Sequence, residues 1–156
     1  MPRLSRRIRD LVTRAARPRR PRREPDVFGY APRADGRPDP GEVVWAWVPF
    51  EEDDGRGKDR PVLLVGSRRA GGGERWLGLM LTSKDHDRDA AQEARQGRYW
   101  MDVGTGGWDR ERRPSEVRLD RLLELEPAGI RREGAALDRA TYDRVLAAAR
   151  RHHALP

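Results

Sequence analysis

The stretch 42–49, EVVWAWVP, decides the fold of this chain. Successive side chains of a β-strand point to opposite faces, and here both sets are apolar. Such a strand is typical of the centre of a sheet that is covered on both sides. We therefore expect a central strand with Trp45 and Trp47 in the core, and we interpret Trp76 in the same way, although indole rings can also stack on nucleic-acid bases.

Turn residues separate further apolar runs downstream of this strand. Residues 51–59, EEDDGRGKD, are expected to form an exposed loop, and 61–66 to resume as a second strand. The glycines at 71–73 predict a turn that leads into a third strand over 75–82. Three strands thus precede residue 83.

The second half of the chain mixes strands with irregular segments. Residues 85–96 are polar and predict a loop with a helical turn, and 99–103 predicts a fourth strand. The segment 104–114 is irregular and glycine-rich, so we expect its Trp108 to be exposed. Residues 115–126 predict one or two short strands.

The C-terminal pattern is helical from 138 to 151. Asp138 can cap this helix, and Leu137 and Tyr142 are spaced for a hydrophobic staple. Five or six strands and one terminal helix indicate a mainly β fold, a small, strongly curved barrel flanked or plugged by the helix.

The charge of the chain is concentrated at its N-terminus. The net charge is +7 over 156 residues, and residues 1–40 alone hold 12 arginines against 5 acidic residues. Residues 41–156 are therefore formally neutral. We predict two parts, a basic Arg/Pro-rich arm and linker over 1–40 and a barrel domain over 41–156.

The arm itself has several readings. Apolar residues at helical spacing predict a short basic helix over 4–16, and the prolines of 18–40 favour an extended, disordered linker. Its arginines could hold RNA, lie on an anionic membrane, or serve solubility.

Composition excludes several classes of protein. The chain has no cysteine, so a disulfide framework and a thiolate metal site are ruled out. It has neither a signal-peptide pattern nor 18 consecutive apolar residues. We expect a cytoplasmic protein without a transmembrane segment.

Familiar catalytic motifs are also missing. The sequence has no nucleophile elbow and no Walker-type phosphate loop. The segment 85–89, DHDRD, is loosely like a calcium loop but lacks the glycine and the terminal glutamate. We expect no metal and no cofactor.

Two small groups of residues point to chemistry on a phosphodiester. Arg60 begins the second predicted strand, and Thr82 ends the third. If these strands pair in antiparallel fashion, the two side chains meet at one rim of the barrel. There a guanidinium can bind two phosphate oxygens, and the threonine hydroxyl can fix a phosphate oxygen, while the ribose 2′-hydroxyl attacks the phosphorus.

Four neighbours of this pair are candidate substrate-binding residues: Lys58, Ser83, Lys84 and His86. Each also has a plain structural reading. Taken alone, Arg60 can be a surface or interface arginine paired with a loop carboxylate. Taken alone, Thr82 can be an ordinary residue at the end of a strand. His86 fits a solvated loop histidine, and the lysines fit loop cations.

The order of these motifs is similar to that of the MazF/PemK toxins of type II toxin-antitoxin systems. The resemblance runs from Gly41-Glu42-Val43-Val44-Trp45 through Arg60-Pro61 and Thr82-Ser83 to the stretch 115–120, SEVRLD, and covers roughly residues 41–150. It implies an SH3-like barrel of the CcdB/MazF/PemK type, a homodimer that cleaves single-stranded RNA without metal, and a cognate antitoxin as inhibitor. It also implies that Arg60 is the catalytic arginine and Thr82 the catalytic threonine.

Two features depart from the family pattern near the site. Arg121 follows Asp120 where the family often has glutamine, and the four acidic residues 51–54 lie in the loop just before Arg60. This acidic loop must swing away, bind a basic partner or weaken RNA binding. The alternatives to a nuclease are a non-catalytic binding module on the same barrel and a gyrase-directed toxin, for which DNA would be a ligand.

Overall fold

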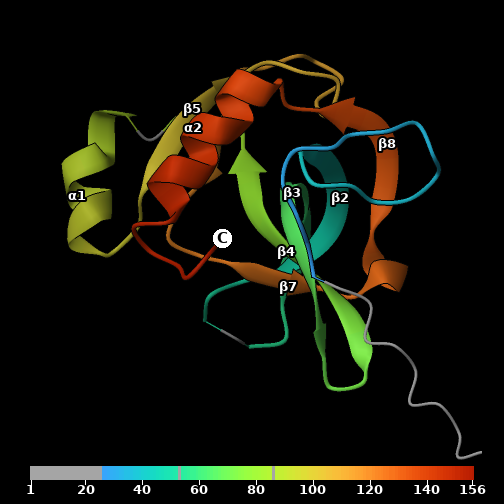
Figure 1. Cartoon of the computed structure of the whole chain (residues 1–156). Coiled ribbons are helices and arrows are strands. Elements are labelled where there is room, and N and C mark those ends of the chain that lie inside the picture. Colours follow the sequence, from blue (N-terminus) through green and yellow to red (C-terminus); the bar gives the residue numbers. More distant parts are fainter. Residues whose placement is uncertain (1–25, 53, 86) are drawn as a thin grey trace, which may run out of the picture.

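In the computed structural model, which describes residues 26–52, 54–85 and 87–156, a curved antiparallel sheet forms the body of the molecule (Figure 1). Its central strands are β2 (Glu42–Pro49), β3 (Gly57–Ala70) and β4 (Gly73–Thr82). The order along the eight-stranded sheet is β5-β6-β4-β3-β2-β8, with β1 paired to β3 and β7 to β4. The prediction of a mainly β, barrel-like fold is confirmed, and β2 lies between two neighbours as expected.

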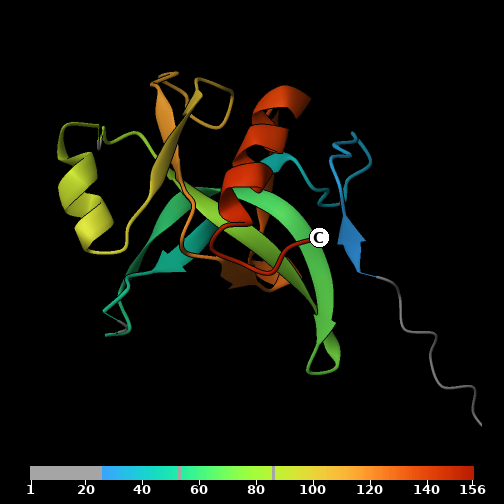
Figure 2. The ribbon, with the colours of Figure 1, turned by 60° about the vertical axis from the view of Figure 1, so that its left-hand side comes forward.

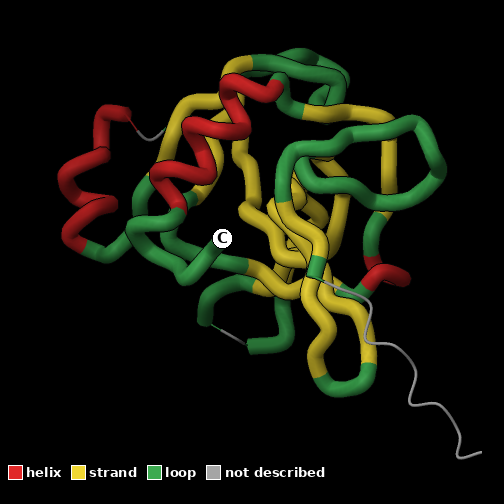
Figure 3. The backbone as a smooth tube through the Cα atoms, in the orientation of Figure 1, coloured by secondary structure: helices red, strands yellow, loops and turns green. Residues whose placement is uncertain are grey.

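The shorter strands extend the sheet beyond its three central strands (Figure 3). They are β5 (Trp100–Gly104), β6 (Ser115–Arg118), β7 (Leu123–Leu125) and β8 (Arg131–Ala136). Between them lie η1 (Asp87–Asp89), α1 (Ala90–Arg95) and η2 (Pro127–Gly129). β8 was not predicted, because its sequence RREGAA has no apolar alternation; it forms by pairing with β2.

The C-terminal helix α2 (Arg139–Ala149) lies across one face of the curved sheet (Figure 2). Its N-cap is Asp138, whose carboxylate accepts the backbone N–H of Thr141 at 2.8 Å. Val145 and Leu146 are buried against sheet residues such as Leu63. The predicted helix and its cap are confirmed.

Two buried clusters hold the sheet together. The larger lies between the sheet and α2, and the smaller lies on the opposite face of β2 and β3 and includes Val44, Val62 and Met80. β2 contributes residues to both clusters, which explains why apolar side chains occur on both of its faces.

Three of the tryptophan predictions need correction. Trp45 was expected in the core but is half-buried, belongs to neither cluster and lines a cavity. Trp47 is 49% exposed, because it lies near the end of β2, beyond both clusters, and covers Gly57 instead. Trp108 is only 3% exposed, and its indole N–H donates to Ser115 Oγ at 3.0 Å. Gly106 leaves room for the Trp108 ring, since a Cβ there would lie 2.0 Å from it.

Part of the predicted linker is folded onto the barrel. β1 (Val27–Phe28) pairs with Gly66 and Ser67 of β3, and the Phe28 ring lies where a side chain on Gly66 would be. Tyr30 donates its hydroxyl to the carbonyl of Leu137 at 2.7 Å. The helix predicted over 4–16 lies outside the described residues.

Candidate nucleic-acid cleavage site

The pairing of β3 with β4 brings the two predicted catalytic residues to one place. Val62 lies opposite Met80 in this ladder. Continuing the register by two residues places Arg60 opposite Thr82, and partners directly opposite in an antiparallel pair point to the same face. Both residues line a cavity of about 180 Å³ at this rim.

Arg60 is a half-buried cation without a counter-ion in the described part of the chain. There its guanidinium makes no hydrogen bond and no ion pair. Burial lowers the pKa of Arg60, and the positive charge of Arg121 lowers it further. Two guanidinium groups held near each other favour an anion between or beside them.

Thr82 is the last residue of β4 and has a second strand at its other side, where it pairs with Glu116 of β6. Its hydroxyl oxygen accepts the backbone N–H of Lys84 at 3.2 Å. This bond fixes the turn after the strand. The hydroxyl proton is not used by this contact.

The other predicted substrate-binding residues divide between two cavities. Lys58 and Ser83 line the cavity of Arg60 and Thr82. Lys84 lies instead in an adjoining cavity of about 400 Å³, which Ser83 also lines. His86 lies outside the described residues.

The acidic loop after β2 is drawn toward a buried arginine of β6 rather than toward Arg60. Glu51 forms an ion pair with Arg118, whose side chain is only 5% exposed. Asp120 binds the same guanidinium at 2.8 Å. The sequence left three alternatives for this loop: it swings away, binds a basic partner or weakens RNA binding. In the structure it binds a basic partner within the same chain, Arg118.

This network changes the protonation behaviour of its members. The hydrogen bond from Arg118 holds the pKa of Glu51 below its ordinary value. Burial alone would raise the pKa of Asp120, but hydrogen bonds from Arg118 and from the Tyr99 N–H outweigh it and lower that pKa. Burial alone would lower the pKa of Arg118, but the hydrogen bonds of Arg118 to Glu51 and Asp120 outweigh burial and raise that pKa.

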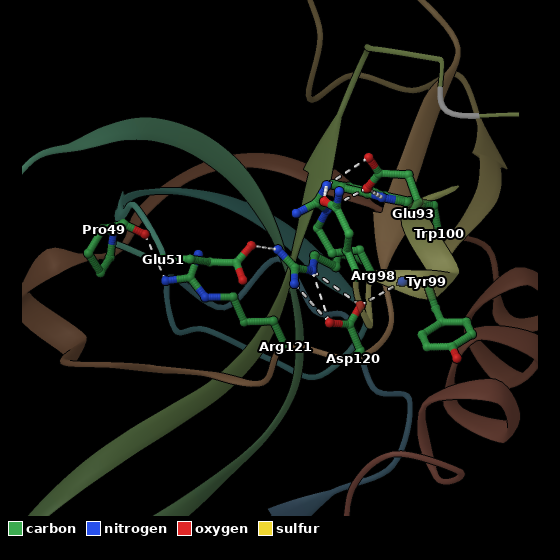
Figure 4. Close-up of polar contacts among 10 residues, drawn as sticks. Pro49, Glu51, Glu93, Arg98, Tyr99, Trp100, Asp120 and Arg121 are labelled. Carbon is green, nitrogen blue, oxygen red and sulfur yellow. Dashed lines mark hydrogen bonds and ion pairs between the residues drawn. The ribbon is translucent and has the colours of Figure 1, made fainter. Parts of the chain in front are cut away.

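Neighbouring contacts fix the surroundings of this network. Arg121 donates to the carbonyl of Pro49 at 2.7 Å, which ties the start of the acidic loop to the β6–β7 connection. Arg98 binds Glu93 of α1 at 2.6 Å, and the Trp100 indole N–H donates to the same carboxylate at 3.1 Å (Figure 4). Farther along the loop, Arg56 binds Asp54 at 2.7 Å.

The roles of Arg118 and Arg121 were not predicted from the sequence. A signal was present in 115–120, where a charged residue interrupts the apolar positions of a short strand. Its partner on the loop is 67 positions away, which no local pattern reveals.

Among the described residues, no three His, Cys, Asp or Glu are grouped so that they could hold a metal ion. No helix within the described ranges is long and apolar enough to cross a membrane.

Comparison with known families decides what this barrel is. The family model of the PemK-like, MazF-like toxin of type II toxin-antitoxin systems matches residues 39–153. The chain belongs to this family. The PemK/MazF match extends from just before β2 to just after α2, and leaves β1 outside it.

Membership confirms the resemblance seen in the order of motifs, and identifies the protein as a PemK/MazF-type toxin. It implies an antitoxin as partner and RNA as substrate. No curated protein matches the chain in a sequence search.

Proposed function

We propose that this PemK/MazF-type chain is a metal-independent endoribonuclease that cuts single-stranded RNA and is inhibited by its antitoxin. The observation that carries the proposal is Arg60, a half-buried guanidinium that has no counter-ion among the described residues and lies beside Thr82 at an open cavity. An unpaired cation in such a position favours a phosphate.

The reaction needs little covalent help from the protein. The ribose 2′-oxygen attacks the adjacent phosphorus and loses its proton, while the bond to the 5′-oxygen breaks and that oxygen takes up a proton. The products are a 2′,3′-cyclic phosphate and a 5′-hydroxyl. Arg60 would stabilise the negative charge that develops on the phosphorane, and Thr82 would donate its hydroxyl to a phosphate oxygen.

Lys58, Ser83 and Lys84 would hold the flanking backbone. Lys58 and Ser83 line the same cavity as Arg60, and Lys84 lies in the next one along the rim. We retain His86 as a candidate substrate contact. We further propose that the toxin acts as a homodimer in the cytoplasm.

The proposal is tested by incubating the full chain with single-stranded RNA in the presence of a chelator, beside Arg60→Ala and Thr82→Val. We expect Arg60→Ala to cut about 100-fold more slowly, because one donor to a developing oxyanion commonly contributes this much. Arg151→Ala is the matched control, since Arg151 is exposed beyond α2. Equal cleavage by the wild type and Arg60→Ala would remove Arg60 from the mechanism.

Induced expression separates the nuclease from its two alternatives. A ribonuclease arrests growth and fragments messenger RNA, whereas a gyrase-directed toxin damages DNA. A non-catalytic binding module does neither. Co-expression of the cognate antitoxin should restore growth in both toxin cases.

A further inference from the structure

A second cavity adjoins the one that holds Arg60 and Thr82. Its volume is about 350 Å³. The two cavities share Trp45, Trp108, Asp109 and Arg113 in their walls, so they are neighbouring parts of one surface. A polynucleotide bound at Arg60 would extend over this second cavity in one of its two directions.

The aromatic wall of this cavity is held rigidly. The Trp45 indole N–H donates to the Trp108 carbonyl at 3.1 Å, and the Trp108 indole N–H donates to Ser115 Oγ at 3.0 Å. Trp108 is buried, while Trp45 is half-buried and lines both cavities. A fixed indole that is partly open to solvent is suited to contact a planar heterocycle.

The charges of the cavity favour an uncharged occupant. It is lined by three arginines and three carboxylates: Arg110, Arg113, Arg131, Asp109, Glu111 and Glu133. The first cavity is lined by three cations, Lys58, Arg60 and Arg113, and by two carboxylates, Asp59 and Asp109, and Arg121 adds a further positive charge near Arg60. A phosphate therefore fits the first cavity, and a neutral group fits the second.

Two of these six charged groups have no partner within the described residues. Arg113 binds Asp109 at 2.8 Å, and Arg131 binds Asp59 of β3 at 3.0 Å. Arg110 and Glu133 are exposed and make no hydrogen bond or ion pair in the described part of the chain. They leave one cationic donor and one anionic acceptor on the walls, and such side chains can bond to the acceptors and donors on the edge of a nucleobase.

We propose that the second cavity binds one nucleobase next to the cleaved phosphodiester, and that Arg110 and Glu133 select which base is accepted. This specificity subsite rests on the proposed ribonuclease function. Trp45 supplies the apolar contact, and the two charged side chains read the donors and acceptors of the base edge.

The test measures binding of the full-length chain to short single-stranded oligoribonucleotides that differ in one central base. A 2′-O-methyl group at every ribose prevents cleavage, so binding is read separately from reaction. We expect the wild type to prefer one base at least about tenfold, in line with the discrimination of a well-placed base contact.

Arg110→Gln and Glu133→Gln should each reduce that preference at least fivefold, while the affinity for the least favoured oligonucleotide changes less than twofold. Arg151→Gln and Glu124→Gln change the same residue types at exposed positions outside the cavity and should keep the preference. Sequencing of the cut ends of natural RNA should show the same change at one position beside the cut.

Three results would overturn the subsite. The first two are no base preference in the wild type and an unchanged preference in both cavity variants. The third is a changed oligomeric state in those variants, which would assign the cavity to contact with a second copy of the chain. Failure of the proposed function looks different. In that case the wild type would not cleave natural RNA, whatever the binding measurements show.

Discussion

Glu51 and Arg118 form an ion pair that joins the loop between β2 and β3 to strand β6. Arg118 is nearly fully buried and also binds Asp120, whereas the side chain of Glu51 is 46% exposed. The loop is therefore attached through a carboxylate that solvent can reach. Water screens the Glu51 end of the pair, whereas the Arg118 end is shielded from it.

Removal of this carboxylate should strengthen RNA binding. Glu51→Gln keeps the size of the side chain but removes a negative charge close to Arg118 and Arg121. We expect RNA affinity at low salt to rise severalfold, because a negative charge near Arg121 no longer repels the phosphates of the RNA. Filter binding or fluorescence anisotropy measures the change. Glu52→Gln, an exposed position in the same loop, is the control, and a loss of affinity in Glu51→Gln would contradict the explanation.

The same network predicts how stability depends on pH. The pKa values of Glu51 and Asp120 are lowered in the folded chain from ordinary values of 4.5 and 3.8. Their contribution is therefore complete above about pH 4.5 and is lost as the pH falls through the lowered folded values. Urea unfolding between pH 3 and 7 should show this decline.

Asp120→Asn should flatten that profile and lower the stability at pH 7. Asp102→Asn, an exposed position on β5, should leave both unchanged. A profile as steep in Asp120→Asn as in the wild type would show that other carboxylates cause the decline.

Arg121 should contribute to RNA binding as a second cation beside Arg60. On the proposed function, Arg121→Gln should weaken binding severalfold and reduce the slope of log affinity against log salt by about 1, as expected for one lost phosphate contact. Affinity titrations at several salt concentrations give the slope. An unchanged slope would show that Arg121 does not contact phosphate and serves only to hold the Pro49 carbonyl.

The N-cap of α2 should matter for stability. The carboxylate of Asp138 accepts both the N–H and the hydroxyl of Thr141. Asp138→Ala should lower the free energy of unfolding by about 1 kcal/mol, whereas Asp138→Asn should retain most of the cap. Urea denaturation compares them, and equal losses in the two variants would indicate that charge rather than capping is responsible.

Docking of β1 should depend on Gly66. A Cβ at this position would lie 2.4 Å from the Phe28 ring and 2.7 Å from the Val27 carbonyl oxygen, so β1 must shift. We expect Gly66→Ala to lower the free energy of unfolding by about 1 to 3 kcal/mol. Gly129→Ala is the control, because a Cβ there meets nothing within 4 Å. A matching small effect in both would mean that β1 contributes little to stability.

Local patterns in the sequence predicted a large part of this fold. The strand over 42–49 and the helix capped by Asp138 follow from the alternation and spacing of neighbouring residues. The closeness of Arg60 and Thr82 was also predictable, because a short turn at Gly71 and Gly72 connects their two strands and makes them a hairpin. When two strands are joined by a short turn, their pairing can be predicted from the local sequence pattern alone.

Tertiary contacts decided the rest. β8 has a polar sequence and forms because β2 offers it a ladder, and β1 forms because Gly66 leaves room for Phe28. The Glu51–Arg118 pair and the tryptophan-lined cavity join segments more than 60 positions apart. Such contacts depend on how the sheet curves, which brings distant chain segments together and is not encoded in any single stretch of the sequence.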